Sequence, residues 1–172
     1  NAILKKMKRR YQRELYADRV EKIKTLMPDA CIGVDVIVGF PGETEEDFEL
    51  LLEGIKKARF NHLGIFRYSD EEGTPAFKLQ PKISQDIIDE RFDRLYEAQR
   101  EIVRELNSAF LGLVIPVLIE GEHEETELLI EGRHFGQAPD IDGKVIINDL
   151  NGVNVEIGDL VMVEIDRKST RL

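Results

Sequence analysis

The sequence predicts an α/β layer of parallel strands followed by a small antiparallel β-barrel. Two observations lead to this fold class. Through residues 1–110, helical and extended segments alternate with short connections, the pattern of parallel strands joined by right-handed crossovers. From residue 111 the hydrophobic period changes to two, and glycines separate the apolar runs at turn spacing. We therefore divide the chain into a first domain, 1–110, and a second domain, 111–172.

The first domain is predicted to hold three main helices and two strands. Apolar residues recur at helical spacing in 12–27, 44–58 and 84–107. Short β-branched or apolar runs at 32–38 and 62–68 predict the strands. Two strands are too few to close a barrel, so we expect this domain to be the last third of a partial barrel whose first strands lie upstream.

The stretch between the first strand and the second helix is a candidate ligand site. Its strand is rich in Val and Ile and is predicted to be covered on both faces. Gly39 and Gly42 then mark a sharp turn, where a ligand can lie against the backbone. Thr44 and Asp47 predict a capped helix start. Ligands bind at the carboxyl ends of strands in such sheets, and a tight turn without a ligand is the alternative.

The second domain is predicted from four apolar runs, at 114–119, 128–130, 145–147 and 160–165. Its charge balance is −8, from five Lys or Arg against thirteen Asp or Glu. A segment of that sign repels phosphate backbones and suits a basic partner. The alternative is that these charges only keep a small β domain soluble.

The composition is that of a globular protein. The 172 residues are 42% hydrophobic and 34% charged, without an apolar run that could span a membrane or a secretory pattern at the start. The single cysteine, Cys31, excludes an internal disulfide framework and suits a cytoplasmic protein. Because Cys31 leads into a predicted strand, we expect it to be a small buried hydrophobe.

Three blocks of sequence resemble one enzyme family. Residues 35–48, Asp-Val-Ile-Val-Gly-Phe-Pro-Gly-Glu-Thr-Glu-Glu-Asp-Phe, resemble the fifth barrel strand and following turn of radical S-adenosylmethionine methylthiotransferases. The flanking blocks 3–11 and 68–76 occur in the order and spacing of that family. The second domain is similar to the TRAM domain of that family. Residues 131–143 would form the middle of the domain, and 158–163 would lead into its last strand. The resemblance covers nearly the whole chain, as the carboxyl-terminal portion of such an enzyme.

The resemblance implies a reaction that this chain does not perform alone. Family members insert sulfur and a methyl group at an unactivated carbon, using S-adenosylmethionine (SAM) and two 4Fe-4S clusters. The radical SAM cluster needs three cysteine thiolates at Cys-x-x-x-Cys-x-x-Cys spacing, and the chain has one cysteine. His62, His123 and His134 are scattered and form no metal set. We expect the cluster ligands to lie before Asn1, so we assign no catalytic or metal-binding residue here.

The resemblance also implies cofactor contacts from the strand and its turn. Apolar side chains would contact the adenosine, glycine backbone would supply polar contacts, and the arginine of a Met-x-Arg pattern would pair with the SAM carboxylate. The residues at these positions are Val36, Val38, Phe40, Gly39, Gly42 and Arg9. A solvated basic helix end is the alternative for Arg9.

Acidic residues favour the branch of the family that modifies an aspartate of a small-subunit ribosomal protein. Asp70, Glu71 and Glu72 follow the second strand of the first domain, and Glu71 and Glu72 stand where tRNA-modifying relatives are expected to carry a basic residue and a proline. We expect this loop and Arg133 to dock a basic ribosomal protein rather than nucleic acid or a membrane. A solvated acidic loop is the alternative for 70–72, and an ordinary loop residue for Arg133.

Two other functions stay open on the sequence. The segments at 8–11 and 33–38 fit the branch that methylthiolates an adenosine in tRNA at least as well. A binding module without enzyme activity is the other possibility, because the chain starts abruptly at Asn1 and lacks the cluster motif.

Overall fold

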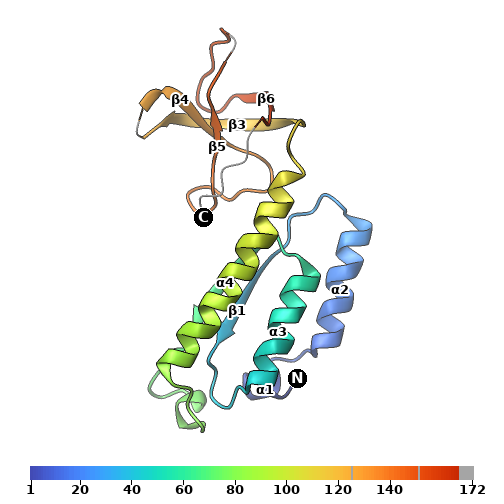
Figure 1. The fold of residues 1–172 in the computed structure, drawn as a ribbon, viewed down its shortest axis with the longest axis vertical. Coiled ribbons are helices and arrows are strands. Elements are labelled where there is room, and N and C mark those ends of the chain that lie inside the picture. The colour runs from blue at the N-terminus through green and yellow to red at the C-terminus, as the bar shows by residue number, and fades with distance from the viewer. Residues whose placement is uncertain (125, 151, 167–172) are drawn as a thin grey trace. The chain divides into compact units, whose positions relative to one another are not determined.

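The computed structural model describes residues 1–124, 126–150 and 152–166 (Figure 1). It divides into two compact units, Asn1–Val103 and Arg104–Leu172, which are described separately. Among the described residues, no helix is both long and apolar enough to cross a membrane.

The first unit is an α/β layer around two parallel strands. Strand β1 (Gly33–Val38) pairs with β2 (His62–Arg67) in register, from Gly33 opposite His62 to Val38 opposite Arg67. The helices are α1 (Ala2–Lys6), α2 (Arg13–Leu26), α3 (Glu45–Ala58), the 3-10 helix η1 (Pro75–Lys78) and α4 (Gln85–Ser108), whose last residues belong to the second unit. The structure confirms the three predicted main helices and both strands, whereas α1 was not predicted.

One face of the strand pair is exposed, which corrects a prediction. Val38 is fully buried, but Ile37 is 36% exposed and its neighbour on β2, Phe66, is 54% exposed. Ile88 of α4 lies against Gly39, the residue that follows β1. The prediction that β1 is covered on both faces is therefore wrong for the part of the chain that the structure describes.

Cys31 is exposed, so the prediction of a buried hydrophobe is also wrong. It precedes β1, which begins at Gly33, and therefore lies outside the paired part of the sheet. A residue beyond the first ladder pair is not held between the strand and its covering helices.

Helix α3 begins with the predicted cap. Thr44 Oγ1 accepts a hydrogen bond from the Asp47 backbone N–H at 3.1 Å, and Asp47 Oδ2 accepts one from the Thr44 N–H at 3.2 Å. This reciprocal capping box satisfies two of the N–H groups that a helix start leaves unpaired. The helix then buries Phe48, Leu52 and Ile55.

Helix α4 buries two polar side chains along its apolar stripe. Gln99, which is 6% exposed, donates a hydrogen bond from Nε2 to the Phe60 carbonyl at 2.9 Å. Arg91 is only 4% exposed, although its side chain carries a charge. It lies three residues after Ile88 and four before Leu95, and therefore on the same side of the helix as these buried residues.

The second unit is a curled antiparallel sheet with strand order β5-β4-β3-β6. The strands are β3 (Val114–His123), β4 (Thr126–Arg133), β5 (Val145–Ile147) and β6 (Leu160–Glu164). The core on its inner side contains Ile115, Val117, Ile119 and Ile147. All four predicted strands are confirmed, and the sheet fits a small barrel-like domain. The end of the predicted barrel, 167–172, lies outside the described residues.

Candidate functional site

The turn after β1 is closed by hydrogen bonds from its own glycines. Gly39 and Gly42 adopt φ values of +82° and +80°, which other residues rarely adopt. The Gly39 N–H donates to Glu43 Oε1 at 3.2 Å, and the Gly42 N–H donates to the Pro81 carbonyl at 2.9 Å. Both donors are thus used inside the chain, so a ligand at this turn would have to meet other groups.

Glu43 connects the turn to helix α4 through a buried ion pair. Its side chain is 5% exposed, and Oε1 lies 2.6 Å from Nη1 of Arg91. Burial raises the pKa of the Glu43 carboxyl, against the opposing effects of the Gly39 N–H and of Arg91. Glu45 extends the network, because it accepts from Arg91 at 3.1 Å and from Arg94 at 2.7 Å. The sequence analysis missed this ion-pair network. The spacing of Arg91 from Ile88 and Leu95 did indicate that Arg91 lies on the buried side of α4.

The predicted apolar cofactor contacts are mostly buried. Val36 is half-buried, Val38 is fully buried, and Phe40 is 5% exposed with its ring 5.3 Å from that of Tyr68 in an edge-on arrangement. A side chain at Gly39 would collide with Ile88 of α4. Helix packing therefore explains why position 39 is a glycine. The predicted cofactor contacts on β1 and its turn, which are Val36, Val38, Gly39, Phe40 and Gly42, stay predictions.

The basic side chain beside the turn is Lys6 of α1. A side chain at Gly42 would meet its Nζ atom. Arg9, the residue predicted for the SAM carboxylate, is exposed in the segment after α1, where its backbone N–H donates to the Leu4 carbonyl at 2.9 Å. Lys6 was missed because it lies outside the Met-x-Arg pattern, and only the folded chain brings it to the turn.

The exposed face of the strand pair carries side chains that the sequence reasoning did not single out. Asp35 and Ile37 of β1 lie opposite Gly64 and Phe66 of β2. An added side chain at Gly64 would meet the carboxylate of Asp35, so the small residue leaves room for it. Because alternate residues of a strand point to opposite faces, this face and the buried Val38 lie on opposite sides of the sheet.

The acidic loop after β2 is partly neutralised by its neighbours. Asp70 forms an ion pair with Lys82 and accepts a hydrogen bond from the Tyr68 hydroxyl at 2.9 Å. The Lys82 ammonium, followed by the Tyr68 hydroxyl, holds the pKa of Asp70 below its usual value. Glu71 accepts from the Ser69 hydroxyl at 3.1 Å, and Glu72 is exposed. Of the three predicted docking acids, Asp70 is thus already paired with a cation.

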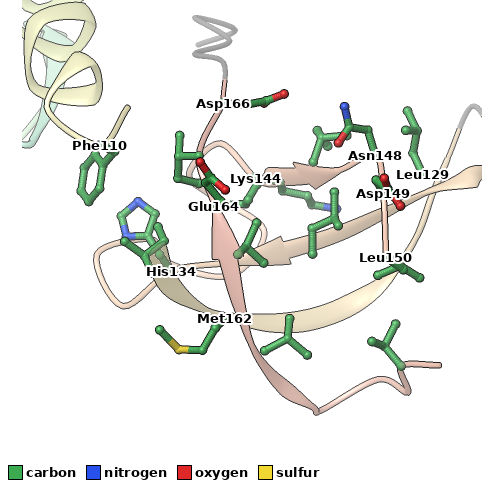
Figure 2. A pocket seen from close by; sticks show the side chains of 18 of the residues that line it. Phe110, Leu129, His134, Lys144, Asn148, Asp149, Leu150, Met162, Glu164 and Asp166 are labelled. Carbon is green, nitrogen blue, oxygen red and sulfur yellow. The ribbon is translucent and has the colours of Figure 1, made fainter. Parts of the chain in front are cut away.

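The second unit contains a groove of about 840 Å³ between β5 and β6 (Figure 2). Its apolar lining includes Phe110, Ile115, Ile147, Leu150, Val161 and Val163. Exposed carboxylates at Asp149, Glu164 and Asp166 also line it. The groove was not predicted, because it forms from strands whose curl and pairing the sequence pattern does not specify.

Comparison with known proteins shows what the chain is similar to. Residues 111–170 match the TRAM domain family. Over 95% of its length, the chain is 43% identical to "Ribosomal protein uS12 methylthiotransferase RimO" of Bdellovibrio bacteriovorus and 45% identical to the protein of the same name in Myxococcus xanthus. The chain is RimO-like in sequence and carries a TRAM domain. It spans about a third of the length of these curated relatives, 35% and 34%.

In the TRAM domain, the predicted docking residue Arg133 is held by a neighbouring strand. Its Nε lies 2.7 Å from Glu120 Oε1 of β3, and its side chain is half-buried. The adjacent His134 accepts a hydrogen bond at Nδ1 from the Gly136 N–H at 3.1 Å and packs against the ring of Phe110. The geometry gives Arg133 a structural role, and its docking role stays a prediction.

The residues of this chain do not supply the ligands of an iron–sulfur cluster. One cysteine cannot supply the three thiolates that a radical SAM cluster needs. Within 1–124, 126–150 and 152–166, the structure shows no group of three His, Cys, Asp or Glu side chains that could hold a metal ion.

Proposed function

We propose that the chain is part of a radical SAM methylthiotransferase that adds a methylthio group to an aspartate of a small-subunit ribosomal protein. The observation that carries this proposal is the similarity to RimO proteins, at 43–45% identity along 95% of the chain. The name of those relatives gives uS12 as their target. We assign both the reaction and a cytoplasmic location to the whole methylthiotransferase of which the chain is proposed to be a part.

We assign residues 1–110 to the last part of a radical SAM barrel. Parallel strands β1 and β2 with covering helices are the repeating unit of such a barrel. Ile37 and Phe66 lie exposed on the other face, as expected of side chains that further strands would enclose. An isolated two-stranded sheet with one exposed apolar face is poorly stabilised, which supports the assignment to a larger barrel.

We assign one wall of the SAM pocket to β1 and the turn that follows it. When bound, SAM and a 4Fe-4S cluster supply the radical that abstracts hydrogen, and ligands for two clusters come from outside this chain. The role of Val36, Val38, Phe40 and the two glycines is to shape and position that wall. The chain alone is therefore proposed to be inactive.

We assign substrate docking to the acidic loop and the TRAM domain. Glu71 and Glu72 are exposed, and residues 111–172 have a charge balance of −8. This charge favours a basic ribosomal protein over tRNA, since a phosphate backbone would be repelled.

The test is deletion of the gene that encodes the chain, followed by mass spectrometry of ribosomal proteins and tRNA nucleosides. Loss of a methylthio group from a ribosomal aspartate, with tRNA unchanged, is the expected result. Loss from tRNA would replace the proposal by the adenosine-modifying alternative. No change in either would favour a binding module without activity.

Complementation of the deleted strain then tests the docking loop. Glu72→Lys is expected to lower the modified fraction of the ribosomal protein several-fold, because the exposed loop loses attraction for a basic partner. Glu53→Lys is the matched control, since it makes the same charge change at an exposed position of α3. Equal effects of the two variants would remove the loop from the docking surface.

A further inference from the structure

Within the described part of the chain, strand β6 has no strand paired on the side away from β3, and this open edge borders the groove between β5 and β6. Among the described residues β6 pairs only with β3, through a register that includes Val161 opposite Val117 and Val163 opposite Ile115. At the two ends, Ile165 donates to the Leu113 carbonyl and Ile119 donates to the Asp159 carbonyl, both at 2.9 Å.

The backbone groups of alternate residues therefore face away from β3. Successive residues of an antiparallel strand direct their N–H and C=O groups to opposite sides. Since Asp159 and Ile165 bond toward β3, Leu160, Met162 and Glu164 direct theirs toward the other side. Met162 and Glu164 line the groove (Figure 2).

The groove combines this edge with an apolar floor. Val161 and Val163 of β6 line it together with Ile147 and Leu150 from across the groove. Its volume of about 840 Å³ lies in the range of sites that enclose a ligand. A strand edge beside pockets for alternate side chains is the arrangement by which proteins bind extended peptides.

The charged residues that line the groove determine whether it favours a positively or a negatively charged ligand. Asp149, Glu164 and Asp166 are exposed carboxylates in its lining. The lysine in the lining, Lys144, is ion-paired with the buried Glu131. The groove is therefore complementary to cations rather than to phosphates or acidic peptides.

We propose that this groove binds an extended, basic segment of the protein substrate by adding it as a strand to the open edge of β6. The inference rests on the proposed function for the identity of the partner. Backbone hydrogen bonds from Met162 and Glu164 hold the segment, apolar side chains of the segment enter the groove, and its lysines or arginines meet the carboxylates.

The test titrates the purified chain with three eight-residue peptides and follows binding by calorimetry and amide NMR. One peptide alternates Lys and Val, a second alternates Glu and Val, and a third is the Lys-Val peptide with alternate backbone nitrogens methylated. The Lys-Val peptide is expected to bind, to shift the amide signals of Met162 and Glu164, and to protect them from exchange. Methylation is expected to weaken binding about tenfold or more, and the Glu-Val peptide is expected not to bind.

Two variants separate the backbone contribution from the side chain. Met162→Pro removes one outward N–H without breaking a bond to β3, as an edge strand tolerates, whereas Met162→Ala keeps that N–H. The proline variant is expected to lose about tenfold in affinity while the alanine variant stays within about twofold, with the thermal unfolding of both checked first. Glu164→Gln combined with Asp166→Asn is expected to weaken binding about three- to tenfold at low salt.

Competition with purified uS12 links the groove to the substrate. Displacement of the labelled Lys-Val peptide by uS12 is expected. Binding of both charged peptides alike, a concentration-dependent dimer through the same edge, displacement by tRNA, or failure of uS12 to compete would each overturn the proposal. Peptide binding is read out without methylthio transfer, so a failure here is distinguishable from a failure of the gene-deletion test.

Discussion

Gly39 combines two constraints that an alanine cannot meet. Its φ of +82° is unfavourable for a residue with a side chain, and a Cβ atom there would collide with Ile88. Gly39→Ala is expected to lower the free energy of unfolding by about 2–4 kcal/mol, from backbone strain and overpacking together. Urea unfolding followed by circular dichroism measures the change.

Gly54 is the matched control for that substitution. It lies inside α3 with open space around it, so Gly54→Ala is expected to raise the stability by about 0.5–1 kcal/mol. Similar effects of the two substitutions would show that Ile88 and the backbone do not constrain Gly39.

The ion pair of Asp70 predicts a pH effect at one residue. Its folded-state pKa is lowered by Lys82, so any stability it contributes is present above the unfolded pKa and is lost as the pH falls through the folded value. Lys82→Met is expected to raise the pKa of Asp70 toward the ordinary aspartate value, about 3.9. Carboxyl NMR titration measures it, with Lys78→Met as the control. An unchanged pKa in Lys82→Met would contradict the pairing.

At the scale of elements, the buried ion pair joins the turn and α3 to α4. Arg91→Met leaves the Glu43 carboxylate buried without its nearest cation, 2.6 Å away in the native chain. The expected loss of stability is about 3–5 kcal/mol at neutral pH. Because the variant raises the pKa of Glu43 further, its deficit should shrink as the pH falls and the carboxyl becomes protonated.

The sign of this pH dependence follows from the direction of the shift. An acid whose pKa is raised by folding stabilises fully below its unfolded pKa, and this stability is lost as the pH rises through the folded value. Arg100→Met is the control, since Arg100 is half-buried and its ion pair with Glu97 is 3.6 Å long; a change within about 0.5 kcal/mol is expected. A deficit of Arg91→Met that is independent of pH would mean that Glu43 does not titrate in the pair.

The main helices and strands could be predicted because their signals are local. The capping residues of α3 and the change of hydrophobic period near residue 111 are readable within a few positions of sequence. The boundaries moved by one or two residues for most elements, as for α3, which begins at Glu45. Short α1 lacked a periodic signal and was missed.

Burial could not be predicted where it depends on contacts between distant segments. The spacing of Arg91 indicates the buried side of α4, but it does not indicate that Glu43, 48 positions away, pairs with it there. Gln99 is interior because the Phe60 carbonyl accepts its hydrogen bond. The same holds for the candidate site. Lys6 reaches the turn, and the groove beside β6 forms, only through tertiary arrangement that neither composition nor periodicity specifies.

At the scale of the whole chain, exposed apolar residues coexist with a net charge of −10. Leu26 and Met27 near the end of α2 are 81% and 61% exposed, and Phe66 on the open sheet face is 54% exposed. Charge repulsion keeps such chains apart at low salt and is screened as salt rises. Static light scattering is expected to show self-association above about 0.5 M sodium chloride, where the Debye length is only a few Å. Phe66→Ser should reduce it, and a monomer at all salt concentrations would contradict this expectation.

Cys31 offers one site for chemical labelling of the chain. It is the single thiol in the sequence, it is exposed, and it lies just before the amino end of β1. Strand β1, whose six residues span about 20 Å, lies between Cys31 and the turn at Gly39. A maleimide fluorophore or spin label therefore attaches at one defined place without cysteine removal, and at a distance that leaves the turn undisturbed.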